Sequence, residues 1–335
     1  MTKPFRNPLV VLALVLILLL AAGYSLTWEL VARQWQRGID AWIKAQAAAG
    51  WTITTGDIKT GGFPGPVRLT LGQPSARRAD GLSWQGPAAT LEIAPWLPEK
   101  PRFTAPGEHH FTPSGGAPIA ITAEQLAGQV TVAQGKPVAL AVTGQNLSGL
   151  GLALAGLNVE LSRPAPDPKE TVPTQVSALI GLDRLTLPDQ INLPFDKMIS
   201  GAHLALRWRG AIPAGPRADA LAQWRDGGGT VEIDSFDLAW PPLALAGDAT
   251  LALDKDLQPE LAGTVVVQGG PATIDRAAKA GMIDKGGANV AKIALMLASK
   301  PVNDGTDAVK IAVAIQNRVL SVGPAPIWQV PPVTW

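Results

Sequence analysis

Few side chains in this sequence are spaced for metal binding or catalysis. The three histidines are His109, His110 and His203, and Glu108 comes directly before the first two. A Glu-His-His run holds three possible metal ligands. Neighbouring residues on a strand point to opposite faces, however, and a metal site needs ligands that converge. We therefore expect a solvated loop at 108–110 and no metal site.

The carboxylates and the glycine-rich stretches give no catalytic pattern either. Glu232, Asp234 and Asp237 are the best candidates for paired acid–base carboxylates. On a strand, Glu232 and Asp234 share one face, and a solvent-facing position explains both. Residues 254–256 lack the glycine and final glutamate of a calcium loop, and the glycines at 227–229 lack the following Lys-Ser/Thr of a phosphate loop.

The remaining inventory of reactive groups is equally sparse. The chain has no cysteine, which excludes disulfides, thiolate metal ligands and cysteine nucleophiles. No Gly-x-Ser-x-Gly motif is present to expose a serine nucleophile. We predict that the protein is not an enzyme and has no catalytic residue, no metal and no cofactor.

Composition favours a sheet protein without a nucleic-acid partner. Among 335 residues the net charge is +1 and only 16% are charged, so the basic stripe of a nucleic-acid-binding protein is not expected. With 35 Gly and 30 Pro, the chain has the turns and interrupted strands of a β-rich fold and not those of a helical bundle. The length allows one large domain or two ordinary domains.

The N-terminus predicts a membrane anchor. Lys3 and Arg6 precede a stretch without charge from Pro8 to Trp28, and about 20 apolar residues suffice to cross a bilayer core of about 30 Å. The positive flank predicts a cytoplasmic N-terminus, so residues 1–28 would anchor the chain in a bacterial inner membrane with its body in the periplasm. The rival is a signal peptide cleaved near 21–23, but the stretch continues as an aromatic helical segment, which favours the anchor.

Residues 29–50 predict an amphipathic helix. Apolar residues recur at helical spacing, and Gly50 is a candidate C-terminal cap; the stripe is Trp28, Val31, Trp35, Ile39, Trp42 and Ile43. The helix either lies along the membrane–water interface or covers one end of a sheet, and the second option is the simpler. Tyr24, Trp28 and Trp35 are the candidate membrane-interface residues.

Residues 51–335 predict a long, curved, mostly antiparallel sheet with a few covering helices. Alternating segments separated by Gly and Pro indicate successive strands with one buried face; among them are 67–71, 89–93, 129–132, 138–142, 150–161, 176–187 and 203–208. The proline-rich stretch near 163–175 is a loop or linker where the body could subdivide. Short helices are expected at 216–224, 274–282 and 288–297. A last pair of strands is expected at 308–316 and 319–322, with a turn at residues 317–318. A Pro-rich tail follows from residue 324.

The clearest strands form a meander between residues 230 and 268. Strands at 230–240, 243–253 and 261–267 are joined by turns at 241–242 and 254–256. The apolar side chains of the second and third strands share one parity and so one face, which we interpret as a hydrophobic groove; its predicted residues are Leu243, Leu245, Leu251, Leu253, Leu261, Val265 and Val267.

This meander resembles part of an uncharacterised bacterial envelope family known only as a domain of unknown function. The resemblance extends to residues 49–52 (Ala-Gly-Trp-Thr), 61–64 (Gly-Gly-Phe-Pro) and 316–324. Its members share an N-terminal anchor and a first strand containing Gly-Trp. Arg318 stands where a tight turn after Asn317 would favour Gly. The overall plan is also similar to AsmA-type envelope proteins, in which the resemblance implies a curved sheet with a hydrophobic groove and a role in lipid handling.

Two functions follow from these patterns. In the first, the apolar face binds lipid, lipoprotein or another hydrophobic envelope component, because about three helical segments cannot cover so long a face. In the second, two sheet layers pack on each other and the body is a structural scaffold for an inner-membrane or envelope partner. Neither resemblance implies catalytic residues.

Overall fold

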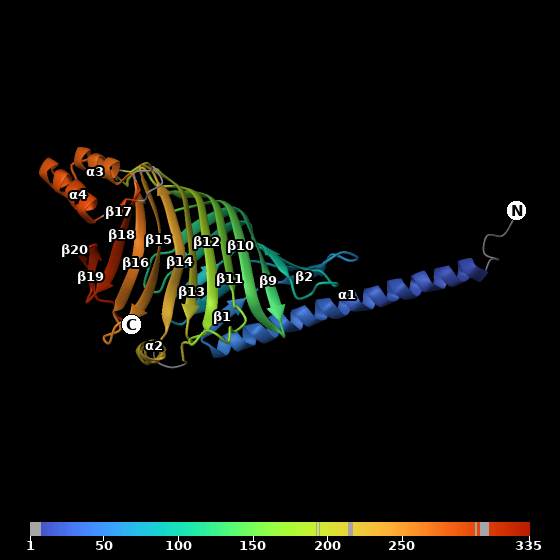
Figure 1. The fold of residues 1–335 in the computed structure, drawn as a ribbon. Helices are drawn as coiled ribbons and strands as arrows, with labels where there is room; N and C mark the ends of the chain where they lie inside the picture. The colour runs from blue at the N-terminus through green and yellow to red at the C-terminus, as the bar shows by residue number, and fades with distance from the viewer. Residues whose placement is uncertain (1–7, 192, 194, 214–216, 299, 302–307) are drawn as a thin grey trace. The chain divides into compact units, whose positions relative to one another are not determined.

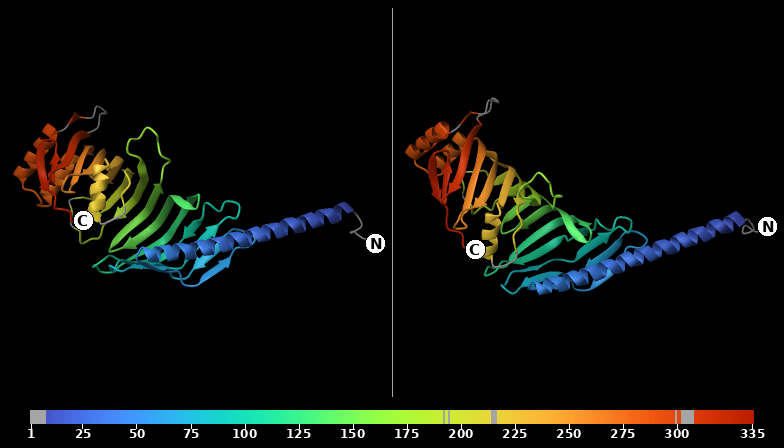
Figure 2. Two further views of the ribbon diagram at one scale, coloured as in Figure 1. Left: turned by 90° about the horizontal axis from the view of Figure 1, so that it is seen from below. Right: turned by 60° about the horizontal axis from the view of Figure 1, so that its bottom comes forward.

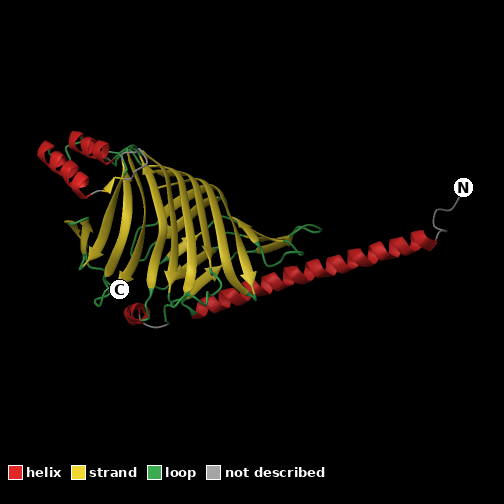
Figure 3. Ribbon diagram, in the orientation of Figure 1, coloured by secondary structure: helices red, strands yellow, loops and turns green. Residues whose placement is uncertain are grey.

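The computed structural model describes residues 8–191, 193, 195–213, 217–298, 300–301 and 308–335. Within them the fold is mainly β, with antiparallel strand pairs and four α-helices (Figure 3). This confirms the predicted fold class. The chain forms two compact units, unit 1 (residues 1–136) and unit 2 (residues 137–335).

The predicted anchor and amphipathic helix are one unbroken helix, α1 (Pro8–Ala48). Gly50 follows with a φ of 83°, and its N–H donates to the carbonyl of Ala47 at 3.1 Å, which ends the helix as the sequence predicts. In the described part of the chain, α1 is the helix long and apolar enough to cross a membrane. The predicted positive flank, Lys3 and Arg6, lies outside the described residues.

Unit 1 combines α1 with nine strands that form two branches. The strands are β1 (Trp51–Thr54), β2 (Ile58–Gly61), β3 (Val67–Leu71), β4 (Ser75–Arg78), β5 (Ser83–Gln85), β6 (Ala89–Ile93), β7 (Arg102–Thr104), β8 (Gly107–Thr112) and β9 (Ile119–Ala133). The first half of β9 pairs with β8, followed by β5, β4 and β1. Its second half pairs with β7, followed by β6, β3 and β2.

The C-terminal half of α1 covers the β3–β6 branch. Val67, Leu69 and Ile93 have no exposed surface there, and they form one core with Trp28 and Ala32 of the helix. Full burial of an aliphatic side chain stabilises the fold by about 1.5–3 kcal/mol. This half of the helix is therefore held by its apolar stripe, and the expectation that it packs on a sheet is confirmed. Figure 2 shows the N-terminal half of α1 extending beyond the strands of unit 1.

Unit 2 is a meander in which consecutive strands are neighbours (Figure 1). Its strands are β10 (Lys136–Gly149), β11 (Leu152–Ser162), β12 (Thr174–Thr186), β13 (Met198–Arg209), β14 (Thr230–Trp240), β15 (Leu243–Leu253), β16 (Pro259–Gln268), β17 (Lys300–Pro301), β18 (Val309–Gln316), β19 (Val319–Val322) and β20 (Ala325–Gln329). β16 pairs directly with β18, and the short β17 also pairs with β18. All these pairs are antiparallel.

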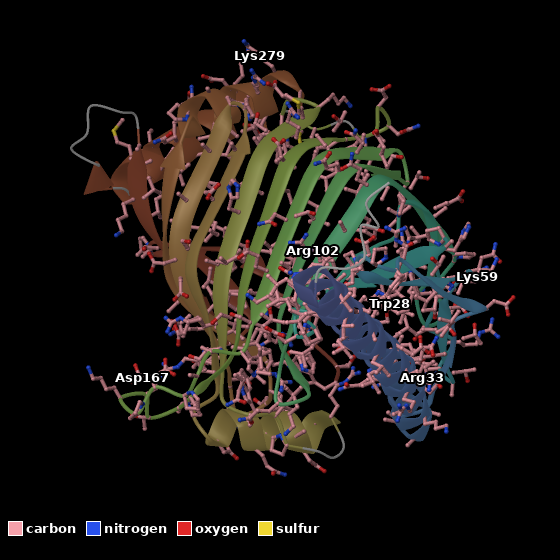
Figure 4. All side chains as sticks on the ribbon, turned by 90° about the vertical axis from the view of Figure 1, so that its right-hand side faces the viewer. Trp28, Arg33, Lys59, Arg102, Asp167 and Lys279 are labelled. Carbon is pink, nitrogen blue, oxygen red and sulfur yellow. The ribbon has the colours of Figure 1, made fainter. Side chains whose placement is uncertain are left out.

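The helices of unit 2 lie at the ends of its strands. α2 (Arg217–Asp226) joins β13 to β14, while α3 (Gly270–Lys279) and α4 (Lys285–Ala298) stand between β16 and β17. In Figure 4, Lys279 of α3 and Asp167 of the loop between β11 and β12 lie at opposite ends of the sheet. In Figure 1, α3 and α4 of unit 2 lie at one end of the strands and α2 at the other.

One local expectation was wrong, and two features of the C-terminal strands add to what was predicted. Residues 108–110 belong to strand β8 and not to a solvated loop. The Pro-rich tail contains a strand, β20, which pairs with β19. The turn between β18 and β19 is tight despite Arg318, because Asn317 and Arg318 both adopt positive φ (49° and 62°) and the Arg318 Nε donates to the Val330 carbonyl at 3.1 Å.

Candidate binding face

The strand register of unit 2 places the predicted groove residues on one face of the sheet. Leu245 pairs with Val267 and Leu251 with Leu261 across β15 and β16. Because side chains alternate between faces, residues two apart on each strand join the same surface. All seven residues therefore share one side, which we call the apolar face.

The apolar face continues across the neighbouring strands. Following the cross-strand pairs outward, each strand adds further aliphatic or aromatic side chains to the same side; among them are Val142, Val159, Ile180, Leu204, Phe236, Leu238, Ile311 and Val313. Eight strands about 4.8 Å apart, each of about ten residues rising about 3.3 Å, give this face a footprint of roughly 1,000 Å².

The side chains of the apolar face are mostly only partly buried. Leu245, Leu251 and Val265 all keep part of their surface exposed. On the branch of unit 1 that α1 covers, by contrast, Leu69 and Ile93 are 0% exposed. The difference arises because the described strands of unit 2 form a single sheet, so lateral neighbours alone shield most of these side chains.

Among the described residues, α2 closes one end of the apolar face. At one end, Leu221 and Trp224 of α2 form a small core with Leu253. Trp224 lies 4.9 Å from Trp208, centroid to centroid, and its Nε1 donates to the Arg209 carbonyl at 2.8 Å. Leu253 is thus the predicted groove residue that the structure buries, at 7% exposure.

The opposite face of the same sheet is polar and carries ion pairs. Arg207 on β13 donates three hydrogen bonds of 2.5, 2.8 and 3.0 Å to Asp234 on β14. The hydrogen bond to Asp234 raises the pKa of the Arg207 guanidinium above its usual value. Glu170, from the loop between β11 and β12, accepts a 2.9 Å hydrogen bond from the Thr174 N–H, and this bond is the main cause that lowers the pKa of Glu170.

A hollow of about 610 Å³ lies on this polar face. Gly144, Gly156 and Gly181 are among its lining residues. Its walls combine polar and aliphatic side chains, among them Thr143, Gln145, Asn158, Leu179, Leu182 and His203. His203 Nδ1 lies 2.8 Å from Asp237 Oδ2, and both side chains are more than half exposed. This is the geometry of a solvated cross-strand pair.

The other histidines also have local partners. His109 is 9% exposed, lies 3.0 Å from the Ala105 carbonyl through Nε2, and stacks on Trp84 at 6.1 Å between centroids. His110 lies 3.4 Å from Glu108. The described residues contain no group of three or more His, Asp or Glu placed to hold a metal.

The three candidate membrane-interface residues of α1 all contact the β-strand part of unit 1. The Tyr24 hydroxyl donates to the Pro64 carbonyl, and Trp28 Nε1 donates to the Gly65 carbonyl at 2.9 Å. Trp35 packs against the same core as Trp28. Their role at a membrane interface stays a prediction.

Residues 28–331 match the model of a family described as an uncharacterized protein conserved in bacteria, DUF2125. The chain belongs to this family. The match bears out the resemblance to a bacterial domain of unknown function. It begins at Trp28, the first buried residue of α1, and so includes both the packed half of the helix and the apolar face. No curated protein and no solved structure matches the chain.

Two aromatic contacts were not predictable from the sequence. Phe63 lies 5.7 Å from Trp28 between ring centroids, edge to face, at the turn between β2 and β3. Phe195 stacks on Trp240 at 4.3 Å near the end of β14. The Gly-Gly-Phe-Pro motif marked the first site, but no local pattern links these aromatic residues to partners tens of positions away.

Proposed function

We propose that the protein is anchored by α1 in the bacterial inner membrane and binds lipid acyl chains on the apolar face of unit 2 in the periplasm, as part of envelope lipid handling. The supporting observation is the partial exposure of that face. Soluble monomers rarely expose contiguous apolar patches larger than a few hundred Å². A face with a footprint of roughly 1,000 Å² gains free energy from an apolar occupant, at about 25 cal/mol for each Å² removed from water.

The distribution of charge favours acyl chains over a polar ligand on that face. Arg207, Asp234 and His203 all project to the opposite side, so the two faces of one sheet differ sharply in polarity. An acyl chain needs no hydrogen-bond partner, and an aliphatic surface without charges suits it. The implied AsmA-like plan agrees with this assignment.

The test is site-specific photocrosslinking in the full chain in native membranes. The photoreactive amino acid p-benzoylphenylalanine replaces Leu245 in one variant. In the matched control it replaces Ala246, the next residue of the same strand, which is exposed on the polar face. Crosslinked species are then identified by mass spectrometry.

Phospholipid adducts at Leu245 and their absence at Ala246 are the expected result. Equal labelling at both positions would show only general contact with lipid and would overturn the proposal. An adduct with a protein at Leu245 would overturn it in favour of the scaffold function, and the absence of any adduct at Leu245 would leave the face without the proposed occupant.

A further inference from the structure

The turn between β2 and β3 is fastened to α1 at the C-terminal end of its charge-free stretch. This turn, residues 62–66, has the sequence Gly-Phe-Pro-Gly-Pro. The Pro64 and Gly65 carbonyls accept hydrogen bonds from Tyr24 and Trp28. The ring of Phe63 lies 6.2 Å from Tyr24 and 5.7 Å from Trp28, between centroids. The turn therefore moves with the helix as one body.

The helix fixes the depth of this turn in a bilayer. α1 is unbroken and rises about 1.5 Å per residue, so a hydrocarbon core of about 30 Å takes up about 20 residues. Within α1, the stretch that meets this length runs from Pro8 to Trp28, between Arg6 and Glu29. When this stretch spans the core, Tyr24 lies about 6 Å before Trp28 along the axis and so inside the membrane boundary. The turn in contact with both residues lies at that boundary.

The chemistry of the turn suits this environment. None of its five residues is charged, and Pro64 and Pro66 have no backbone N–H to satisfy. The Gly65 N–H donates to the Gly62 carbonyl at 2.7 Å. The Pro64 and Gly65 carbonyls accept hydrogen bonds from the side chains of Tyr24 and Trp28. Backbone groups that enter lipid must be satisfied inside the protein. Phe63 nevertheless remains 56% exposed, which is unfavourable in water and favourable among acyl chains.

Charged residues begin just beyond the turn, on the side away from the span. Arg33 pairs with Glu29 at 2.8 Å along α1, and Arg68 pairs with Glu92 at 2.8 Å on β3 and β6. Lys59 is exposed on β2 (Figure 4). This change from an uncharged to a charged surface along both the helix and the hairpin matches the change from acyl region to water.

We propose that the turn 62–66 inserts into the headgroup–acyl boundary of the bilayer that α1 crosses, with Phe63 as its lipid-facing anchor, so that unit 1 sits directly on the membrane surface. This inference rests on the membrane anchor of the proposed function. It adds a second membrane contact that holds the helix and the sheet in one orientation.

The absence of native cysteine allows a clean test. Phe63→Cys, Asp57→Cys and Leu16→Cys each introduce a unique thiol into the full chain. The thiol is labelled with the fluorophore NBD, and the protein is placed in nanodiscs of phosphatidylcholine and phosphatidylglycerol in equal amounts. Asp57 is exposed just before β2, at the other end of the hairpin, and serves as the water-facing control. Leu16 lies in the span and serves as the lipid-facing control.

At position 63 we expect quenching by nitroxide-labelled phospholipid and loss of quenching by aqueous iodide. Position 57 should show the reverse pattern. If position 16 reports lipid but position 63 behaves like position 57, the turn lies in water and the inference is overturned, while the anchor stands. If position 16 itself is open to iodide, the anchor fails and the inference fails with it.

Discussion

Whether the apolar face is open can be decided by comparing the same substitution in two places. Leu69→Ala removes a side chain with no exposed surface beneath α1, whereas Leu245→Ala removes a partly exposed one from the apolar face. Three methylene-sized groups at about 0.8 kcal/mol each account for about 2.4 kcal/mol at full burial. At Leu69 a residual cavity adds to this, giving about 3–4 kcal/mol. At Leu245 partial exposure and the lack of a covering layer reduce the loss to about 1 kcal/mol.

Hydrogen exchange measured by mass spectrometry on the detergent-solubilised full chain resolves the two sites. The amides of β3 report Leu69→Ala and those of β15 report Leu245→Ala, so each unit is followed by its own opening free energy. A loss of about 3 kcal/mol at both positions would refute the reasoning, because it would require a layer packed over Leu245. A loss of about 1 kcal/mol at both would mean that α1 covers Leu69 more loosely than its burial indicates.

Two further predictions concern backbone geometry and pH. Gly269→Ala is expected to lower the melting temperature more than Gly135→Ala. Both glycines have φ near 70°, but of the two only Gly269 would place the new Cβ against a backbone oxygen, that of Pro242 at 1.8 Å. Equal decreases in melting temperature would contradict this clash. Glu170→Gln is expected to lower the urea midpoint at pH 7, because the pKa of Glu170 is lowered in the folded protein. A carboxyl whose pKa is lowered by folding stabilises the protein at pH values above its pKa in the unfolded chain, about 4.3. The difference in urea midpoint between wild type and variant should therefore shrink below that pH and vanish below the pKa of the folded state. A difference in midpoint that persists at lower pH would contradict this role.

The strands of unit 2 were predictable because each is long and alternates regularly. The ranges 230–240 and 243–253 agree with β14 and β15 residue for residue. Once the register is sequential, parity alone assigns Leu245 and Leu251 to one face. The exposure of that face was not predictable, because it depends on whether another layer packs above it, and no local pattern carries that information.

Unit 1 was harder to predict because its strands are short and pair across long separations. β1 pairs with β4, β3 with β6, and β5 with β8, and several of these strands contain only three to five residues. Alternation over so few residues does not identify a partner. The burial of His109 illustrates the problem, since it depends on Trp84 from β5, a strand distant in sequence. The packing of α1 against Val67 and Leu69 likewise joins residues far apart in the sequence.

The sequential order of unit 2 has a consequence for how it forms and varies. Each strand from β11 to β16 needs only the strand made just before it as a template, so the sheet can grow one strand at a time by pairing strands that are consecutive in sequence. Stability in such an array is approximately a sum of nearest-neighbour terms. Adding or removing one hairpin of this sheet would therefore change its width without altering the pairing of the remaining strands.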